Sequence, residues 1–275
     1  MKKLKTRVPQ ETYSKEYYLA DEYAGASLFK NKSESMVPQL ERIYRQVKPT
    51  KKGKFLDAGC GKGELLYFMS KKGYQVYGVD YARASIKLTS EYLRKKKVEG
   101  IVKQADVRDV PFEDDYFDVI ISEDVIEHLD NEKASLDFLN EAYRVLKPGG
   151  KFYLHTAPNK LFLECYFKYI GRWLNALFLS AVNLFLPQKR KFKVNLSLRT
   201  PTDEVVHINE QTYFTLKRVC RSSHFRKFSI TIVADPLTFS LLKAPYYILV
   251  YLFPLNKVFP LSIILGNHLY VTLEK

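Results

Sequence analysis

Residues 55–63 read Phe-Leu-Asp-Ala-Gly-Cys-Gly-Lys-Gly, and this stretch decides the fold. An apolar run meets an acid, three glycines follow at alternate positions, and residues 64–67 then have helical character. Glycine removes side chains where a ligand could touch the backbone. The stretch therefore predicts a strand, a tight turn and a helix start of the kind that binds nucleotides.

Two further acids follow apolar runs along the chain. Asp80 ends the run 76–79, at about the distance from the glycine turn at which an acid reaches ribose hydroxyls in a βαβ nucleotide fold. Asp106 comes at the end of the run 101–105. The carboxyl ends of parallel strands meet at one edge of a sheet, where open α/β sheets bind ligands.

The spacing disfavours a dinucleotide. The fingerprint G-x-G-x-x-G would place its third glycine at position 64, which is Glu64. Asp57 inside the turn would also repel a pyrophosphate. Neither feature disfavours a cationic, phosphate-free nucleoside, and S-adenosylmethionine is such a ligand.

Five blocks of sequence, taken together, resemble the class I S-adenosylmethionine-dependent methyltransferases. They are Asp57-x-Gly59-x-Gly61-x-Gly63, then Asp80, Asp106, the strand 117–121 and the segment 144–150, which reads Arg-Val-Leu-Lys-Pro-Gly-Gly. The blocks span residues 54–158. The segment 214–225 is also similar to the end of that fold, with His224 where glycine is usual.

This resemblance implies S-adenosylmethionine as cofactor and a set of residues that bind it. The glycines admit the methionine part, Asp57 orients its amino-acid end, and Asp80 accepts from the ribose hydroxyls. Tyr81 covers the adenine and Asp106 accepts from its amino group. The full predicted set is Asp57, Gly59, Cys60, Gly61, Gly63, Asp80, Tyr81, Asp106, Val107, Ser122 and Glu123.

Strand-like and helix-like segments alternate from residue 54 onward, which predicts a parallel, doubly wound α/β sheet. Expected strands are 54–58, 75–79, 100–104, 117–121, 151–156, 228–234 and 268–274, with helices at 36–48, 63–72, 83–95 and 133–146. The fold class is a Rossmann-like, seven-stranded sheet, mostly parallel with an antiparallel last strand, plus apolar helical insertions. We expect an N-terminal arm over residues 1–35 and one domain over 36–275.

Two apolar insertions, 159–200 and 237–267, interrupt this alternation. In the first, Glu164, Lys168 and Arg172 form one narrow polar stripe on an otherwise apolar helix. Neither insertion is expected to span a bilayer, because the uncharged runs are too short or broken by proline. A lid over the substrate, a dimer contact and a patch dipping into one membrane leaflet all remain open.

The net charge is +14, which reflects either solvated lysine faces or attraction to an anionic surface. A basic cluster at 189–193 follows the first insertion, beside aliphatic runs, so a membrane surface is favoured over nucleic acid. Three scattered cysteines indicate a reducing compartment, and the basic start is not followed by an apolar stretch. We therefore expect a cytoplasmic protein that can lie peripherally at a membrane; its oligomeric state stays open.

Three histidines are candidates for catalysis. His128 lies in a segment that resembles the E-x-x-E-H sequence of ubiquinone-type O-methyltransferases, with Asp124 replacing the first glutamate, and a structural role is the favoured interpretation. His155 ends the fifth strand, and His207 precedes a helix cap where related enzymes often place a histidine near the methyl group. No metal site is predicted.

The predicted function is methyl transfer by in-line displacement, with an oxygen of a small, lipid-like or lipid-linked acceptor as the target. A base is needed only if that acceptor starts protonated. The alternatives are a non-catalytic, cofactor-binding scaffold subunit and a methyltransferase that acts on RNA or protein.

Overall fold

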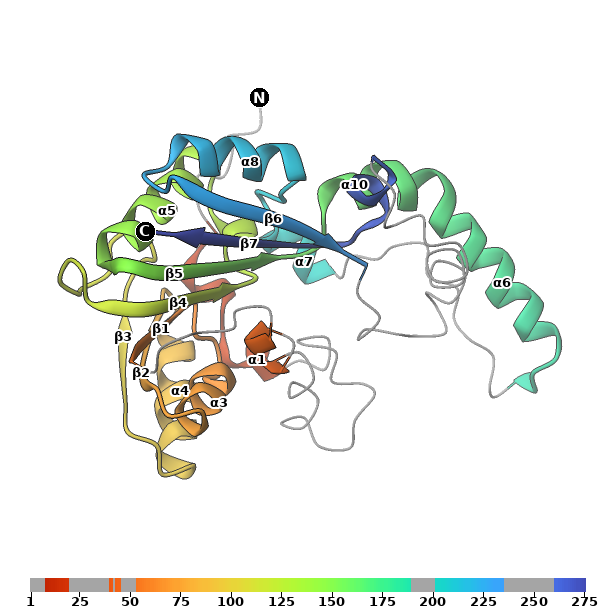
Figure 1. Cartoon of the computed structure of the whole chain (residues 1–275). Coiled ribbons are helices and arrows are strands. Elements are labelled where there is room, and N and C mark those ends of the chain that lie inside the picture. Colours follow the sequence, from red (N-terminus) through yellow and green to blue (C-terminus); the bar gives the residue numbers. More distant parts are fainter. Residues whose placement is uncertain (1–7, 20–39, 42, 46–52, 189–200, 235–259) are drawn as a thin grey trace.

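A mixed sheet of seven strands, in the order β3-β2-β1-β4-β5-β7-β6, organises the chain (Figure 1). This computed structural model describes residues 8–19, 40, 41, 43–45, 53–188, 201–234 and 260–275. The strands are β1 Lys54–Ala58, β2 Gln75–Asp80, β3 Gly100–Gln104, β4 Phe117–Glu123, β5 Leu146–Thr156, β6 Lys227–Val233 and β7 His268–Glu274.

Strands β1 to β5 pair in parallel, and β7 runs antiparallel between β5 and β6. The inner strands β1, β2 and β4 are apolar and mostly buried, as expected for strands covered on both faces. Strand β7 instead alternates buried and half-buried residues. The predicted Rossmann-like, mostly parallel sheet with an antiparallel last strand is confirmed.

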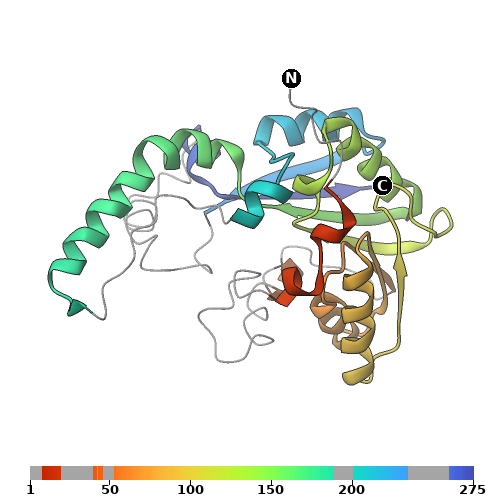
Figure 2. The same ribbon diagram turned by 180° about the vertical axis from the view of Figure 1, so that it is seen from behind.

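Helices cover both faces of the sheet (Figures 1 and 2). The helices of the described residues are η1 Gln10–Thr12, α1 Lys15–Leu19, α3 Glu64–Lys71, α4 Arg83–Lys95, η3 Ile126–His128, α5 Glu132–Val145, η4 Phe162–Gly171, α6 Arg172–Leu184, α7 Pro201–Val206, α8 Tyr213–Ser222 and α10 Leu261–Leu265. Phe138 of α5 and Leu216 of α8 belong to the core on one face. Leu66 of α3 and Leu93 of α4 belong to the core on the other.

The predicted elements recur with small shifts of their ends. Strand β5 begins at Leu146 rather than 151, because Leu146 already pairs with Phe117 of β4. Of the predicted helix 36–48, residues 40, 41 and 43–45 are helical and the rest lies outside the described residues. Parts of the arm and of both insertions, namely 1–7, 20–35, 189–200 and 237–259, also lie outside them.

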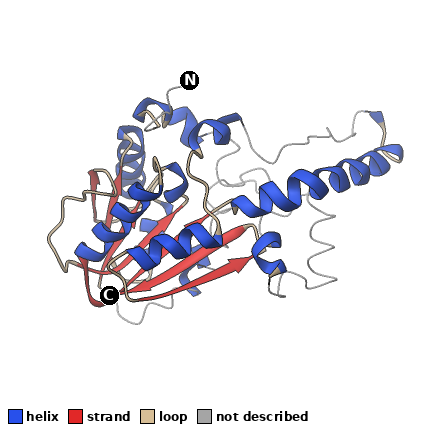
Figure 3. Cartoon of the chain, turned by 90° about the horizontal axis from the view of Figure 1, so that it is seen from above, coloured by secondary structure: helices blue, strands red, loops and turns tan. Residues whose placement is uncertain are grey.

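The first insertion forms a long helix that projects from the body (Figures 1 and 3). Its first part, η4, is π-helical and its second part, α6, is α-helical. Phe162 and Phe167 of η4 pack with Ala234 and Leu265, which anchors the root of the helix to β6 and α10. Within the described residues, no helix combines the length and the hydropathy needed to cross a membrane.

Candidate functional site

The glycine loop between β1 and α3 has the conformation that its sequence predicts. Gly59, Gly61 and Gly63 all have positive φ, of 99°, 51° and 82°. The amide groups of Gly59 and Cys60 donate to the Val79 carbonyl at 2.8 and 3.0 Å, so β2 holds the loop in place. A Cβ added at Gly59 would lie 2.2 Å from Val125 Cγ2, which explains why this position requires glycine.

Asp80 fixes the same loop from the end of β2. Its Oδ2 accepts from the Gly61 amide at 3.0 Å, and its Oδ1 accepts from the Ala82 amide at 2.8 Å. Ser85 and Thr89 of α4 donate their hydroxyls to the Gly61 carbonyl. Asp80 therefore shapes the loop, and the predicted ribose contact would add to the bonds that its carboxylate already accepts.

Acidic side chains gather around the loop. Burial raises the pKa of Asp57 well above its ordinary value, and the charges of Glu123 and Asp80 raise it further. Burial also raises the pKa of Asp80, against the bonds from Ala82 and Gly61, and that of Glu64, against the nearby Lys62. A bound cation would relieve this repulsion, so the residues present fit a cationic ligand.

Three of the predicted cofactor residues point their side chains into the protein. The Cys60 thiol lies 3.8 Å from Thr89 Oγ1, and its pKa is raised by burial and then by Asp80. The Ser122 hydroxyl donates to the Ala58 carbonyl at 2.8 Å, and Val107 is buried in the core. Because these side chains point inward, Cys60 and Ser122 have only their backbone groups available for contact with a ligand.

Asp106 is engaged by a neighbour. Its carboxylate accepts from Arg108 Nε at 2.9 Å and Nη2 at 2.8 Å, and Arg108 Nη1 also lies 3.5 Å from Asp130. A contact with an adenine amino group would therefore share this carboxylate with Arg108. Tyr81 lies beside Asp80, and its carbonyl accepts from Gln104 Nε2 at 3.1 Å.

The N-terminal arm reaches the site through η1. Gln10 Nε2 donates to the Tyr81 carbonyl, and the Tyr13 hydroxyl lies 3.1 Å from His128 Nδ1. Burial raises the pKa of Tyr13, and the charges of Asp80 and Glu127 contribute, which places this ring close to both carboxyl groups. The described part of the arm therefore covers the region between the ends of β2 and β4.

His155 belongs to a chain of three polar side chains at the end of β5. Its Nδ1 lies 3.0 Å from Asp124 Oδ1, and its Nε2 lies 2.8 Å from His268 Nδ1. Burial alone would lower the pKa of His155, but the Asp124 carboxylate raises it to about 9. The Asp124 carboxylate therefore favours the protonated form of His155, which disfavours a role for this side chain as a free base.

The other two predicted histidines lie together, with ring centroids 4.9 Å apart. Burial, and then the charge of His207, lowers the pKa of His128 to about 4, so its ring is neutral. The two sides of that ring face Tyr13 and the Val206 carbonyl, in keeping with the structural role predicted for it. His207 differs, because its Nδ1 is buried and makes no hydrogen bond among the described residues.

Glu127 completes this cluster from η3. Its Oε2 accepts from Thr156 Oγ1 at 2.9 Å, and burial, followed by the Asp124 charge, raises its pKa well above the ordinary value. One ligand atom from each of Glu127, His128 and His207 lies within 4.8 Å of the others, a separation that a divalent cation could bridge. The sequence predicted no metal here, and Tyr13 and Val206 already engage His128.

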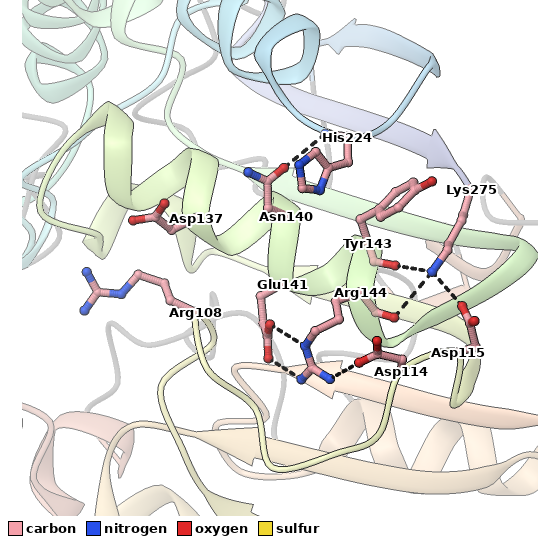
Figure 4. A pocket seen from close by; sticks show the side chains of 10 residues that line it. All are labelled: Arg108, Asp114, Asp115, Asp137, Asn140, Glu141, Tyr143, Arg144, His224 and Lys275. Atoms are coloured by element: carbon pink, nitrogen blue, oxygen red, sulfur yellow. Dashed lines mark hydrogen bonds and ion pairs between the residues drawn. The ribbon is translucent and has the colours of Figure 1, made fainter.

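A polar cavity of about 650 Å³ lies along α5 and the β3–β4 connection, and its lining includes Arg108, the residue that holds Asp106 (Figure 4). Arg144 of α5 pairs there with Glu141 and Asp114, and Lys275 pairs with Asp115. Arg144 also donates to the carbonyls of Val110 and Phe112. These bonds tie the β3–β4 connection to α5, so the cavity is a structural junction away from the glycine loop.

Sequence reasoning missed Glu127, His268 and Tyr13 as members of the site. His268 lies 113 positions from His155, and only the antiparallel insertion of β7 brings them together. A usable signal was the position of His268 at the start of an alternating last strand, because the start of an antiparallel strand lies beside the end of its neighbour.

Comparisons with known proteins agree with this geometry. Residues 56–154 match the family model described as a methyltransferase domain. The ubiquinone biosynthesis O-methyltransferase of Pelagibacter ubique is 31% identical over 139 residues, which cover 48% of this chain and 55% of that protein. In other curated relatives the match spans between 28% and 49% of the relative's length.

Solved structures share the fold over nearly the whole chain. Phosphoethanolamine N-methyltransferase 2 of Haemonchus contortus, in complex with S-adenosyl-L-methionine, has a TM-score of 0.58 at 18% identity and covers 97% of this chain and 56% of that one. A SAM-dependent methyltransferase from Archaeoglobus fulgidus has a TM-score of 0.54 at 20% identity, covering 94% and 99%.

Proposed function

Residues 56–154 of this chain are a class I S-adenosylmethionine-dependent methyltransferase domain, and on this basis we propose that the protein transfers a methyl group to an oxygen of a small, lipid-like or lipid-linked acceptor. The domain match supports the donor and the reaction type. The acceptor is inferred from the groups around the open edge of the sheet.

The observation that carries the proposal is the buried carboxyl cluster around the glycine loop. Asp57, Asp80 and Glu64 all have raised pKa values because burial disfavours their charged forms. S-adenosylmethionine brings a sulfonium and an ammonium group, and its positive charge complements this cluster. A ligand with phosphate groups would meet repulsion at the same place.

The cofactor, when bound, supplies a methyl group already activated by its positive sulfur. The protein then has to hold the acceptor in line and exclude water, since orientation supplies much of the rate. The arm residues Gln10 and Tyr13 bond to Tyr81 and His128, so they close the edge of the site against solvent. A dry site also strengthens the electrostatic interactions within it.

A hydroxyl acceptor must lose its proton, and His207 is the candidate base. Its amide donates to the Asp203 carbonyl, and its Nε2 lies 3.9 Å from Asp203 Oδ1. Asn209 secures the following turn by donating its amide to the Glu127 carbonyl. One ring nitrogen of His207 lies within 4.8 Å of a Glu127 carboxylate oxygen, and the buried Nδ1 makes no hydrogen bond among the described residues, so it is available to an acceptor hydroxyl.

Two features favour a lipid-like acceptor. The apolar helix formed by η4 and α6 begins directly after the carboxyl end of β5, at the edge that holds His155. The similarity to a ubiquinone biosynthesis O-methyltransferase points to an oxygen on a molecule with an apolar tail. A tail of this kind could lie along the root of the helix while its hydroxyl reaches His207.

The test has two stages. Calorimetry should first detect binding of S-adenosylmethionine by the intact chain; a failure to bind would overturn the whole proposal. The chain is then incubated with methyl-labelled cofactor and a lipid extract. We expect label in the organic phase, on an oxygen by mass spectrometry. Label on nitrogen, on RNA or on protein would refute the proposed acceptor while leaving the donor intact.

Variants of two histidines sharpen the second stage. Replacing the base, in His207→Gln, should lower turnover by about a hundredfold or more without weakening cofactor binding. The matched control is His224→Gln, since His224 is exposed and its ring packs against Tyr143 of α5 rather than against Glu127. Equal turnover in both variants would remove His207 from the mechanism.

A further inference from the structure

The projecting helix has an exposed apolar face, which is unusual for a helix that leaves the body of a protein (Figures 1 and 3). The exposed fractions are 56% for Trp173, 71% for Leu177, 81% for Leu184 and 88% for Phe185. Trp173, Leu177 and Leu184 recur at spacings of four and seven, so they lie on one side of the helix, and Phe185 follows directly after its last residue. A patch of this kind marks an interaction surface rather than scattered apolar residues.

The opposite side of the helix is buried, which fixes how the exposed face is presented. Leu163, Tyr166 and Leu179 are buried, and Asn175 is the buried polar residue among them. At the root, Asn159 donates its side-chain amide to the carbonyls of Ile263 and Gly266. The root of the helix is therefore fixed to the body of the protein, and the exposed apolar face belongs to a folded, anchored helix.

The charged residues of the sequence that carries this face and follows it are mostly basic, and the acidic Glu164 of η4 pairs with Lys168. Between positions 165 and 202 the sequence has seven basic residues and no acidic residue. Lys168 and Arg172 lie on the helix itself, and Arg172 stacks 5.0 Å from the ring of Trp173. Basic residues beside exposed tryptophan and leucine are typical of helices that lie in the interface of an anionic membrane.

We propose that the η4–α6 helix docks on an anionic lipid bilayer, with Trp173, Leu177 and Phe185 inserted among the acyl chains and headgroups. A second copy of the chain fits this face less well, because it would bring together two segments that each have a net positive charge. Nucleic acid fits less well, because a nucleic-acid strand binds along a positively charged groove, whereas Leu177, Leu184 and Phe185 present uncharged apolar surface. The proposal concerns where the protein acts and stands independently of its acceptor.

Docking in this way would place the open edge of the sheet near the membrane surface. The helix root follows Thr156, whose hydroxyl donates to Glu127, and the Lys160 amide donates to the Gln211 carbonyl close to His207. The same short segment therefore links the apolar face to the candidate base. An acceptor embedded in a bilayer could reach the site with its apolar part still in lipid.

The test is flotation of the intact chain with vesicles of phosphatidylcholine alone and of phosphatidylcholine mixed with phosphatidylglycerol. We expect flotation with the mixed vesicles at low salt, and its loss at high salt or without the anionic lipid. In the double variant Leu177→Glu, Leu184→Glu the bound fraction should fall at least about tenfold, because charge replaces inserted apolar surface.

A matched control places the same two charges elsewhere. Ile101 on β3 and Phe214 on α8 are also exposed apolar residues, so Ile101→Glu, Phe214→Glu should float like the original chain. Binding of S-adenosylmethionine by all three proteins shows that each is folded. The proposal is overturned if the original chain stays at the bottom, floats equally with neutral vesicles, or floats despite Leu177→Glu, Leu184→Glu. If the original chain does not float but forms a dimer, and Leu177→Glu, Leu184→Glu makes it monomeric, the face serves self-association instead.

Discussion

Asp57 is the residue whose ionisation is most directly linked to ligand binding at the glycine loop. It is almost fully buried at the end of β1, and its pKa is raised by burial and by the charges of Glu123 and Asp80. A cation at the loop would favour the ionised form and lower that pKa. Binding and proton release are therefore linked at this position.

The first prediction follows from that linkage. Binding of S-adenosylmethionine should release protons, and its affinity should rise as pH rises through the raised pKa values of Asp57 and Glu64. Calorimetry in two buffers of different ionisation enthalpy measures the release. S-adenosylhomocysteine, which lacks the sulfonium charge, should release fewer protons. Equal heats in both buffers would contradict the linkage.

A second prediction concerns His155 and Asp124. The folded pKa of His155, about 9, lies above its unfolded value of 6.5, so its pairing with Asp124 stabilises the fold fully below about pH 6.5. This stabilisation is lost as pH rises through 9. His155→Gln should lower the free energy of unfolding at pH 6 by about 1 kcal/mol, which corresponds to a drop of a few degrees in the melting temperature.

The measurement is the melting temperature of the original chain and of His155→Gln from pH 6 to about pH 10. The difference between the two melting temperatures should shrink toward zero at the upper end of this range. His224→Gln serves as the control, because that histidine is exposed and distant from Asp124. A difference between His155→Gln and the original chain that stays constant with pH would show that the ion pair is not its cause.

Single residues also show the limit of sequence reasoning. The spacing of acids and glycines indicates Asp57 and Asp80, since both are placed by the ends of apolar strands. It does not reveal that Asp106 is held by Arg108, or that the Cys60 thiol faces Thr89. Those partners depend on side-chain direction within a turn, and a spacing pattern does not contain that information.

At the scale of elements, the glycine loop and the turn at 149 offer a controlled comparison. Gly59 and Gly149 both have positive φ, of 99° and 75°. A Cβ at Gly59 would meet Val125 Cγ2 at 2.2 Å, whereas at Gly149 nothing lies within 4 Å. The two positions therefore share a backbone conformation that would strain any residue other than glycine, and they differ in packing.

The third prediction uses this difference. Gly149→Ala should cost about 1 kcal/mol of stability through strain alone and leave cofactor binding unchanged. Gly59→Ala should cost about 2–4 kcal/mol, because it adds overpacking, and should abolish cofactor binding. Chemical denaturation and calorimetry measure the two effects. Equal losses of stability in both variants would contradict this prediction, because they would show that the Val125 side chain moves aside at no cost in free energy.

Elements differ in how well the sequence predicts them. The inner strands were predictable because each is a continuous apolar run that ends at an acid or a glycine. The π-helical geometry of η4 was not, since its apolar residues fit an ordinary helical pattern equally well. The early start of β5 depends on pairing with Phe117, which is a contact between distant segments.

At the scale of the whole molecule, the arm joins the two ends of the site. Val8 and Tyr18 are buried, and Gln10 and Tyr13 bond to Tyr81 and His128. The fourth prediction is that deletion of residues 1–19 leaves the sheet folded but weakens binding of S-adenosylmethionine by about tenfold, because the site loses its cover. Circular dichroism and calorimetry separate the two effects.

A milder variant controls for the deletion. Tyr13→Phe removes only the hydroxyl next to His128 and keeps the ring in place. Its cofactor affinity should lie between those of the full chain and the shortened one. If the shortened chain binds as tightly as the full chain, the arm acts on the acceptor alone or has no part in the site.

The position of β7 has a consequence for how the chain is made. Its residues are synthesised after those of the other six strands of the described sheet, yet β7 lies between β5 and β6 and is the strand that β6 pairs with. A nascent chain that has already released β6 therefore holds a strand without its neighbour, and β5 with an open edge. The sheet closes only when residues 268–274 leave the ribosome, so the interval before that moment is when the growing chain is most exposed to mispairing.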